Sequence, residues 1–174
     1  LILATTTTLG RLGFKGFQIR INERRILKAM ARYSGFPEDR YDEVFIILDK
    51  MDKIGIDGVK SELIETGFAE ESASKYVDLF VKMEEADDKL AFLEEKLSGN
   101  IEDDVIPTLR ETIDTVDATK SAEFRMVFDP TIVRGMSYYT GTIFEIAMPE
   151  LGISCGGGGR YDEMVGKFTG TNVP

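Results

Sequence analysis

The segment VRGMSYYTGTIFE, residues 133–145, places an arginine in a loop-like stretch just before a run typical of a β-strand. An arginine beside a strand end can hold a phosphate or a carboxylate through a forked pair of hydrogen bonds. Arg134 is therefore a candidate anion-binding residue. For a lone arginine, a surface ion pair with Asp129 or Glu145 is the simpler interpretation, because exposed charges are common.

Two adjacent tyrosines, Tyr138 and Tyr139, follow this arginine. In an extended chain adjacent side chains face opposite sides. One tyrosine can therefore pack into the core while the other offers its hydroxyl group to a pocket. The alternative is two ordinary strand tyrosines, which β-propensity also favours.

A run of four glycines, Gly156–Gly159, is the second unusual feature. Without side chains, a backbone can approach a ligand closely. A flexible turn or a bulge is the alternative interpretation. The run is not a phosphate-binding P-loop, because no Lys-Ser/Thr pair follows it. It is not a dinucleotide-binding fingerprint either, because the spacing and the strand–helix context are wrong.

Several kinds of chemistry are excluded by composition. The chain has no histidine and a single cysteine, Cys155, so it cannot build a Cys/His zinc site, a Ser–His or Cys–His nucleophile, or an internal disulfide. Most carboxylates fall on expected helix faces, where a solvated surface is the better interpretation. The residues alone thus indicate a pocket built by a hairpin and leave its ligand open.

Charge is unevenly distributed along the 174 residues, which carry a net −10. Residues 36–125 hold 25 acidic and 11 basic side chains, a net −14, and the remainder is mildly basic. A global basic footprint for nucleic acid is therefore absent. No run is apolar enough to span a membrane, and the opening LILATTTTLG is a poor signal peptide. Neither end resembles a natural terminus, and we expect a fragment of a longer chain.

The elements that must position these residues are predicted as follows. Alternation in FQIRIN predicts a half-buried strand, with Asn22 as the N-cap of the next helix and Gly35 as its stop. The acidic middle predicts several helices. FRMVF, TGTIFEIAM and ISCGGGG predict three strands, the last two forming a hairpin. We therefore expect an α+β fold with core segments at 1–35 and 123–174 and a helical insertion at 36–122.

Together these segments resemble the histidyl-tRNA synthetase family of class II aminoacyl-tRNA synthetases. VRGMSYYTGTIFE is similar to the family's first histidine-specific motif, and CGGGGRYDEMV is similar to its second. FQIRINERRIL resembles the segment after class II motif 2, and LDKMDKIGIDGVKSELIETG resembles the start of the helical insertion domain. The resemblance covers nearly the whole chain, in the family's order. It implies part of the class II antiparallel sheet, interrupted by an all-helical insertion.

The resemblance implies histidine activation by ATP to histidyl-adenylate, followed by transfer to tRNA(His). Arg134 matches the motif arginine near the α-phosphate and the histidine carboxylate, where fixed positive charge suits the transition state. The hydroxyl of Tyr139 is implied to meet the imidazole; a site that bonds both ring nitrogens rejects most other amino acids. The residues implied to bind histidine are Tyr138, Tyr139, Tyr161, Gly157 and Gly158.

The family also implies partners outside this chain. Its motifs 1 and 2 precede the sequence, and motif 3 and the anticodon-binding domain follow it, together with most ATP contacts, the Mg²⁺ ligands and a homodimer interface. We expect an inactive fragment of a cytoplasmic enzyme, with no metal site of its own. One departure, Ser137 where many members carry Asp, is peripheral. In the insertion Lys50, Lys53 and Lys60 could contact tRNA phosphates, although an acidic bundle used for packing or gating is an equal alternative.

Two other functions remain open. A non-catalytic paralogue, such as the regulatory subunit of ATP phosphoribosyltransferase, would keep the same hairpin motifs and use the pocket to sense histidine. Such paralogues typically lack the long insertion, so its presence favours the synthetase. A free-standing helical binding module is disfavoured by the hairpin motifs that follow the insertion.

Overall fold

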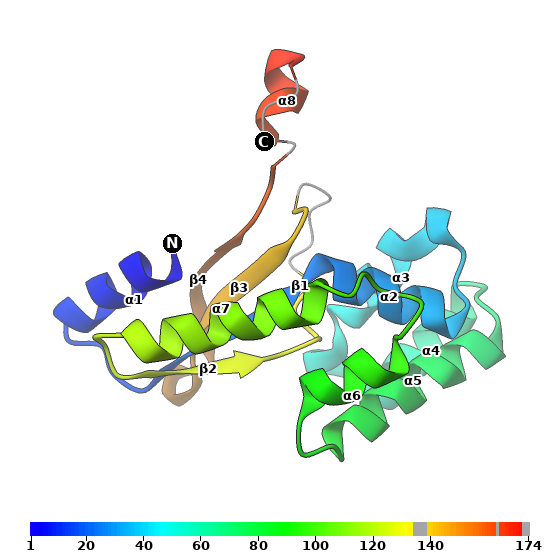
Figure 1. Ribbon diagram of the computed structural model, residues 1–174. Coiled ribbons are helices and arrows are strands. Elements are labelled where there is room, and N and C mark those ends of the chain that lie inside the picture. Colours follow the sequence, from blue (N-terminus) through cyan, green and yellow to red (C-terminus); the bar gives the residue numbers. More distant parts are fainter. Residues whose placement is uncertain (134–138, 163, 172–174) are drawn as a thin grey trace.

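The structure is a computed structural model that describes residues 1–133, 139–162 and 164–171 (Figure 1). Its helices and 3-10 turns (η) are α1 (Ile2–Arg11), α2 (Arg24–Ser34), η1 (Glu38–Arg40), α3 (Tyr41–Leu48), α4 (Met51–Glu65), α5 (Glu70–Glu84), α6 (Lys89–Lys96), α7 (Val105–Thr119), η2 (Pro149–Leu151) and α8 (Met164–Thr169). Its strands are β1 (Phe17–Glu23), β2 (Phe124–Phe128), β3 (Thr142–Met148) and β4 (Ile153–Gly159).

The strands form one sheet in the order β2-β1-β3-β4. The β1/β3 and β3/β4 pairs are antiparallel, and β1/β2 is parallel. Parallel neighbours need a long crossover, and the helices α2 to α7 supply it between β1 and β2. The predicted α+β fold, the hairpin and the helical middle are confirmed. The parallel pair makes this part of the sheet mixed, whereas we expected only antiparallel pairing.

Strand β1 shows why the sheet has two different faces. Phe17, Ile19 and Ile21 are at most 1% exposed and point toward the helices, as their alternation predicts. Helix α7 lies across this face and contacts both β1 and β2 (Figure 1). The ring of Phe17 stacks on Phe124 of β2 at 5.4 Å, which ties the parallel pair together from the core side.

Helix α2 begins one residue later than expected. Glu23, not Asn22, is its N-cap, and the Glu23 side chain accepts a hydrogen bond from the Arg25 amide. The prediction for Asn22 was wrong because this residue is still in β1, where its amide is used for a tertiary contact. The predicted stop is confirmed, since Gly35 caps α2 in the left-handed region with φ 85°.

Helices α3 to α6 form a separate group beside the sheet (Figure 1). Aromatic rings fill its centre: Phe36 meets Phe68 and Tyr76 edge to face, and Tyr76 meets Phe80 in the same way. Gly55 breaks α4 with φ 69° and ψ 175°, so the chain bends there before the longer part of the helix. Helix α7 lies within the proposed insertion but packs on the sheet. The proposed insertion boundary at 122 therefore stays a prediction.

Among the described residues, no helix is long and apolar enough to cross a membrane.

Candidate functional site

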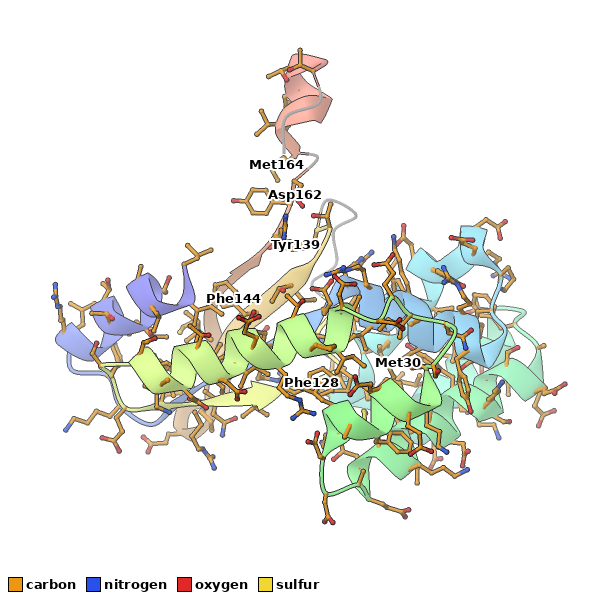
Figure 2. The ribbon with its side chains drawn as sticks, in the orientation of Figure 1. Met30, Phe128, Tyr139, Phe144, Asp162 and Met164 are labelled. Atoms are coloured by element: carbon orange, nitrogen blue, oxygen red, sulfur yellow. The ribbon has the colours of Figure 1, made fainter. Side chains whose placement is uncertain are left out.

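The two proposed histidine-specific motifs meet where β3 begins and β4 ends. Arg134 and Tyr138 lie outside the described residues, whereas Tyr139 and Tyr161 lie within them. The rings of Tyr139 and Tyr161 are 6.1 Å apart in an edge arrangement. Figure 2 shows Tyr139 and Asp162 beside one another at this end of the hairpin. The fold therefore brings together two tyrosines that are 22 positions apart in the sequence.

Hydrogen bonds continue the β3/β4 ladder up to these tyrosines. The Thr140 amide donates to the Arg160 carbonyl, and the Arg160 amide donates to the Thr142 carbonyl, both at 2.8 Å. The Asp162 carboxylate accepts from the Thr140 hydroxyl at 3.3 Å and from Arg160 Nε at 2.8 Å. These bonds hold residues 139–142 against 159–162, so the two motifs form one structural unit.

The glycines at the end of β4 are required by close packing. A Cβ atom added to Gly159 would lie 2.7 Å from the Thr142 carbonyl oxygen and 2.8 Å from Tyr139 Cδ1. At Gly158 it would lie 3.2 Å from the Phe144 ring. Gly157 pairs with Glu145, so it alternates with Gly158 and opens to the opposite face of the sheet. That both Gly157 and Gly158 line a histidine pocket stays a prediction.

A buried carboxylate lies next to this unit. Glu23 is only 2% exposed. Its Oε2 accepts from the Thr142 hydroxyl at 3.0 Å, and its Oε1 accepts from Arg25 Nε at 3.1 Å. A Cβ added to Gly141 would approach Glu23 Oε2 at 3.6 Å. Glu23 therefore joins the start of α2 to the start of β3, within the first motif.

The opposite face of the sheet carries a charged cleft of about 520 Å³ between the sheet and the α3–α4 connection. Arg20 lies at its base and pairs with Asp129 at 2.6 Å, Glu145 at 3.3 Å and Asp52 at 3.4 Å. Partial burial lowers the pKa of the Arg20 guanidinium, but attraction to these carboxylates, chiefly Asp129, outweighs it and leaves the pKa raised. Asp52 and Lys53 bring the helical group to the cleft wall.

The three lysines proposed to contact RNA have different surroundings. Lys50 is ion-paired to Glu62, so a neighbouring charge already balances it. Lys53 lines the charged cleft. Lys60 lies farther along α4, beyond the Gly55 break. The role of these lysines in RNA binding stays a prediction.

Sequence reasoning missed the polar residues of β1 and the start of α2. Arg20, Asn22 and Arg24 occur at every second position, so they continue along one face of the extended chain. All three hold the segment that leads into the first motif. The residue types were visible in the sequence, because Arg20 and Asn22 are polar positions of β1 and Arg24 opens α2. The segment they would hold, 129–133, could not be identified without the fold.

Known proteins with similar sequences place the chain among the aminoacyl-tRNA synthetases. Its relatives are aminoacyl-tRNA synthetases: the histidine–tRNA ligase of Leifsonia xyli is 43% identical over 100% of this chain and 41% of its own length. The family described as histidyl-tRNA synthetase matches residues 1–174. The chain belongs to the histidyl-tRNA synthetase family. It spans about two fifths of the length of this relative.

Solved structures agree with this assignment. The histidyl-tRNA synthetase of Nostoc sp. PCC 7120 has a TM-score of 0.78 and 30% identity over 98% of this chain and 41% of its own. A Bacillus halodurans protein titled an ATP phosphoribosyltransferase regulatory subunit/histidyl-tRNA synthetase has a TM-score of 0.69 over 96% of this chain and 43% of its own. At 22% identity, the second likeness shows the fold alone.

Proposed function

We propose that this chain is the central part of a histidine–tRNA ligase, which activates histidine with ATP and transfers it to tRNA(His). The observation that carries the proposal is the joining of the two motifs into one unit, with Tyr139 and Tyr161 6.1 Å apart at its end. The 43% identity to a histidine–tRNA ligase over the whole chain supports it. We propose the cytoplasm as its location, a homodimer as its working form, and the chain alone as inactive.

The proposed roles follow from charge and position. Arg134 would hold the α-phosphate and the histidine carboxylate, because a guanidinium stays charged and presents a planar fork of donors. The Tyr139 hydroxyl would bond one imidazole nitrogen, and Tyr138 and Tyr161 would line the same pocket. Gly157 and Gly158 would let the substrate approach the strand backbone. These donors would position and stabilise the reacting groups and need no covalent intermediate on the protein.

Magnesium would accompany ATP and screen its phosphates. The described residues contain no group of three or more His, Cys, Asp or Glu side chains that could hold a metal. We propose that the magnesium ligands lie in parts of the protein outside this chain, and we assign none of the described residues as one. The proposed roles of Arg134 and the tyrosines do not depend on it.

A histidine-sensing regulatory subunit is the second candidate. The helical insertion does not by itself separate the two functions, because the Bacillus halodurans protein with the double title matches 96% of this chain. Identity separates them better: 43% to the Leifsonia xyli ligase against 22% to that protein. We therefore favour the catalytic function.

The test is histidine-dependent exchange of pyrophosphate into ATP by the full-length protein that carries this chain. We expect Arg134→Ala to lower the exchange rate by at least about 100-fold, as removal of a transition-state donor does. Tyr139→Phe should raise the KM for histidine by about 10-fold, the value of one lost hydrogen bond. Arg125→Ala, an exposed arginine of β2, is the matched control and should leave the rate unchanged. A folded protein that binds histidine without exchange would instead be the regulatory subunit.

A further inference from the structure

The segment 129–133, which leads directly into Arg134, contacts three side chains of the β1–α2 junction. We propose that Arg20, Asn22 and Arg24 form a clamp that fixes the segment 129–133, the backbone that leads into the proposed catalytic Arg134, and that the helical insertion is attached to this clamp at both ends. The inference rests on the proposed function for its consequence, catalysis. The clamp itself is a set of contacts between described residues.

The central contact is made by Asn22. This side chain is fully buried, at 0% exposure, and both of its polar atoms are used. Its Nδ2 donates to the Ile132 carbonyl at 3.0 Å, and its Oδ1 accepts from the Glu23 amide at 2.8 Å. A buried amide with both ends bonded has one favourable orientation, because any rotation leaves a polar atom unpaired. The backbone two residues before Arg134 is therefore fixed to the centre of the sheet.

Arg20 holds the beginning of the same segment. Its Nε donates to Asp129 Oδ2 at 2.6 Å, and its Nη2 donates to the Thr131 hydroxyl at 3.2 Å. Asp129 in turn accepts from the Thr131 amide at 2.9 Å and from the Thr131 hydroxyl at 2.6 Å. The Ile132 amide closes a turn onto the Asp129 carbonyl at 3.3 Å, with Pro130 at the position that favours such a turn.

Arg24 lies at the other end of the clamp. Its Nη1 faces the carbonyl of Val133, the residue before Arg134, at 3.5 Å, a long contact. The side chain is 6% exposed, and burial lowers the pKa of its guanidinium despite the attraction of Asp42. Nη2 pairs with Asp42 at 3.0 Å, and the guanidinium lies 5.0 Å from the centre of the Phe45 ring. Asp42 and Phe45 belong to α3, the first helix of the insertion.

The insertion therefore touches the clamp at two points. Asp52, in the α3–α4 region, pairs with Arg20, and Asp42 of α3 pairs with Arg24. A shift of α3 together with the start of α4 relative to the sheet would change both ion pairs and, through them, the backbone before Arg134. Catalysis falls steeply with such displacements, since a shift of about 1 Å can change a rate about 100-fold.

The experiment uses the full-length protein and two substitutions in the clamp. Asn22→Leu keeps the number and branching of the side-chain heavy atoms and removes both hydrogen bonds, although leucine is the larger residue. Thr131→Val is milder, because it removes only the hydroxyl contacts to Asp129 and Arg20 at a partly exposed position. We expect kcat for pyrophosphate exchange to fall by about 10- to 100-fold in Asn22→Leu and by about 3- to 10-fold in Thr131→Val. The KM for histidine should rise by a smaller factor than kcat falls, since the Arg134 contact to the histidine carboxylate weakens while the tyrosine contacts remain.

Two controls separate positioning from general destabilisation. Leu93→Ala removes a fully buried side chain in the helical group and should lower the urea midpoint of unfolding without changing kcat below the unfolding temperature. Hydrogen exchange of the 129–133 amides should accelerate in Asn22→Leu and Thr131→Val and stay unchanged in Leu93→Ala.

The outcomes are distinct. A fall in kcat that exceeds the rise in KM, together with faster hydrogen exchange at 129–133, supports the clamp. Unchanged kcat in both clamp variants, or an equal fall in Leu93→Ala, overturns the positioning role while the proposed function stands. If the unmodified full-length protein shows no pyrophosphate exchange, the proposed function is wrong, and the positioning of a catalytic arginine is wrong with it.

Discussion

Substituting Gly159 by alanine should disrupt the junction of the two motifs. The added Cβ would lie 2.7 Å from the Thr142 carbonyl oxygen, 2.8 Å from Tyr139 Cδ1 and 2.9 Å from Ile143 Cγ2. The carbonyl cannot retreat easily, because it accepts the Arg160 amide at 2.8 Å. Overpacking of this kind costs about 1–3 kcal/mol. A value near 2 kcal/mol corresponds to a change of about 30-fold in the ratio of folded to unfolded protein.

The assay is urea unfolding of the 174-residue chain, compared with Gly156→Ala in the same strand. At Gly156 the added Cβ would meet only Ile146 Cδ1, at an ordinary 3.5 Å, so the free energy of unfolding should change by less than about 0.5 kcal/mol. In the full-length protein, Gly159→Ala should also raise the KM for histidine, because the least constrained of the three contacts is the Tyr139 ring. Equal effects of the two substitutions would refute the reasoning.

Two further predictions concern the helical group. Tyr76 is fully buried, and its hydroxyl has no hydrogen-bond partner among the described residues; burial raises the pKa of this phenol. Tyr76→Phe should therefore leave the free energy of unfolding unchanged or raise it by up to about 1 kcal/mol, measured in urea, and a clear loss would reveal a hidden partner. A hydrogen bond from Arg110, then one from the Ala91 amide, lowers the pKa of Asp88 below its ordinary 3.8. Because the folded-state value is the lower one, the stabilisation by Asp88 relative to Asp88→Asn is complete above about pH 4 and disappears as the pH falls through the folded-state pKa. Unfolding midpoints of both proteins between pH 2 and about 6 test this, and a difference that persists at the lowest pH would contradict it.

The elements of the sheet could be predicted from local patterns. Alternation in β1 identified its buried face, and Gly35 marked the end of α2. These features follow from the period of the backbone and from the freedom of glycine, which act over a few residues. The start of α2 could not be placed in the same way, because Asn22 is the better N-cap by residue type, and a contact with distant Ile132 takes up its side chain instead.

Some features of the candidate site could also be read from the sequence, and others depended on the fold. The motifs around Tyr139 and Tyr161 were visible in the sequence, and so was the absence of histidine and of a second cysteine, which excludes several kinds of catalysis. The distance of 6.1 Å between the Tyr139 and Tyr161 rings could not be predicted, because it depends on the β3/β4 register. The need for glycine at 159 likewise comes from atoms of Thr142 and Tyr139 that the fold brings close.

Local sequence patterns predicted the strands, the helical middle and the types of residue available for chemistry. The parallel pairing of β2 with β1, and the contact of residues 129–133 with Asn22, follow only from the fold. The difference lies in the distance along the chain over which each effect acts. Propensity and periodicity act between neighbours along the chain, whereas a buried amide such as that of Asn22 must find its partner wherever the fold supplies one, here 110 residues away.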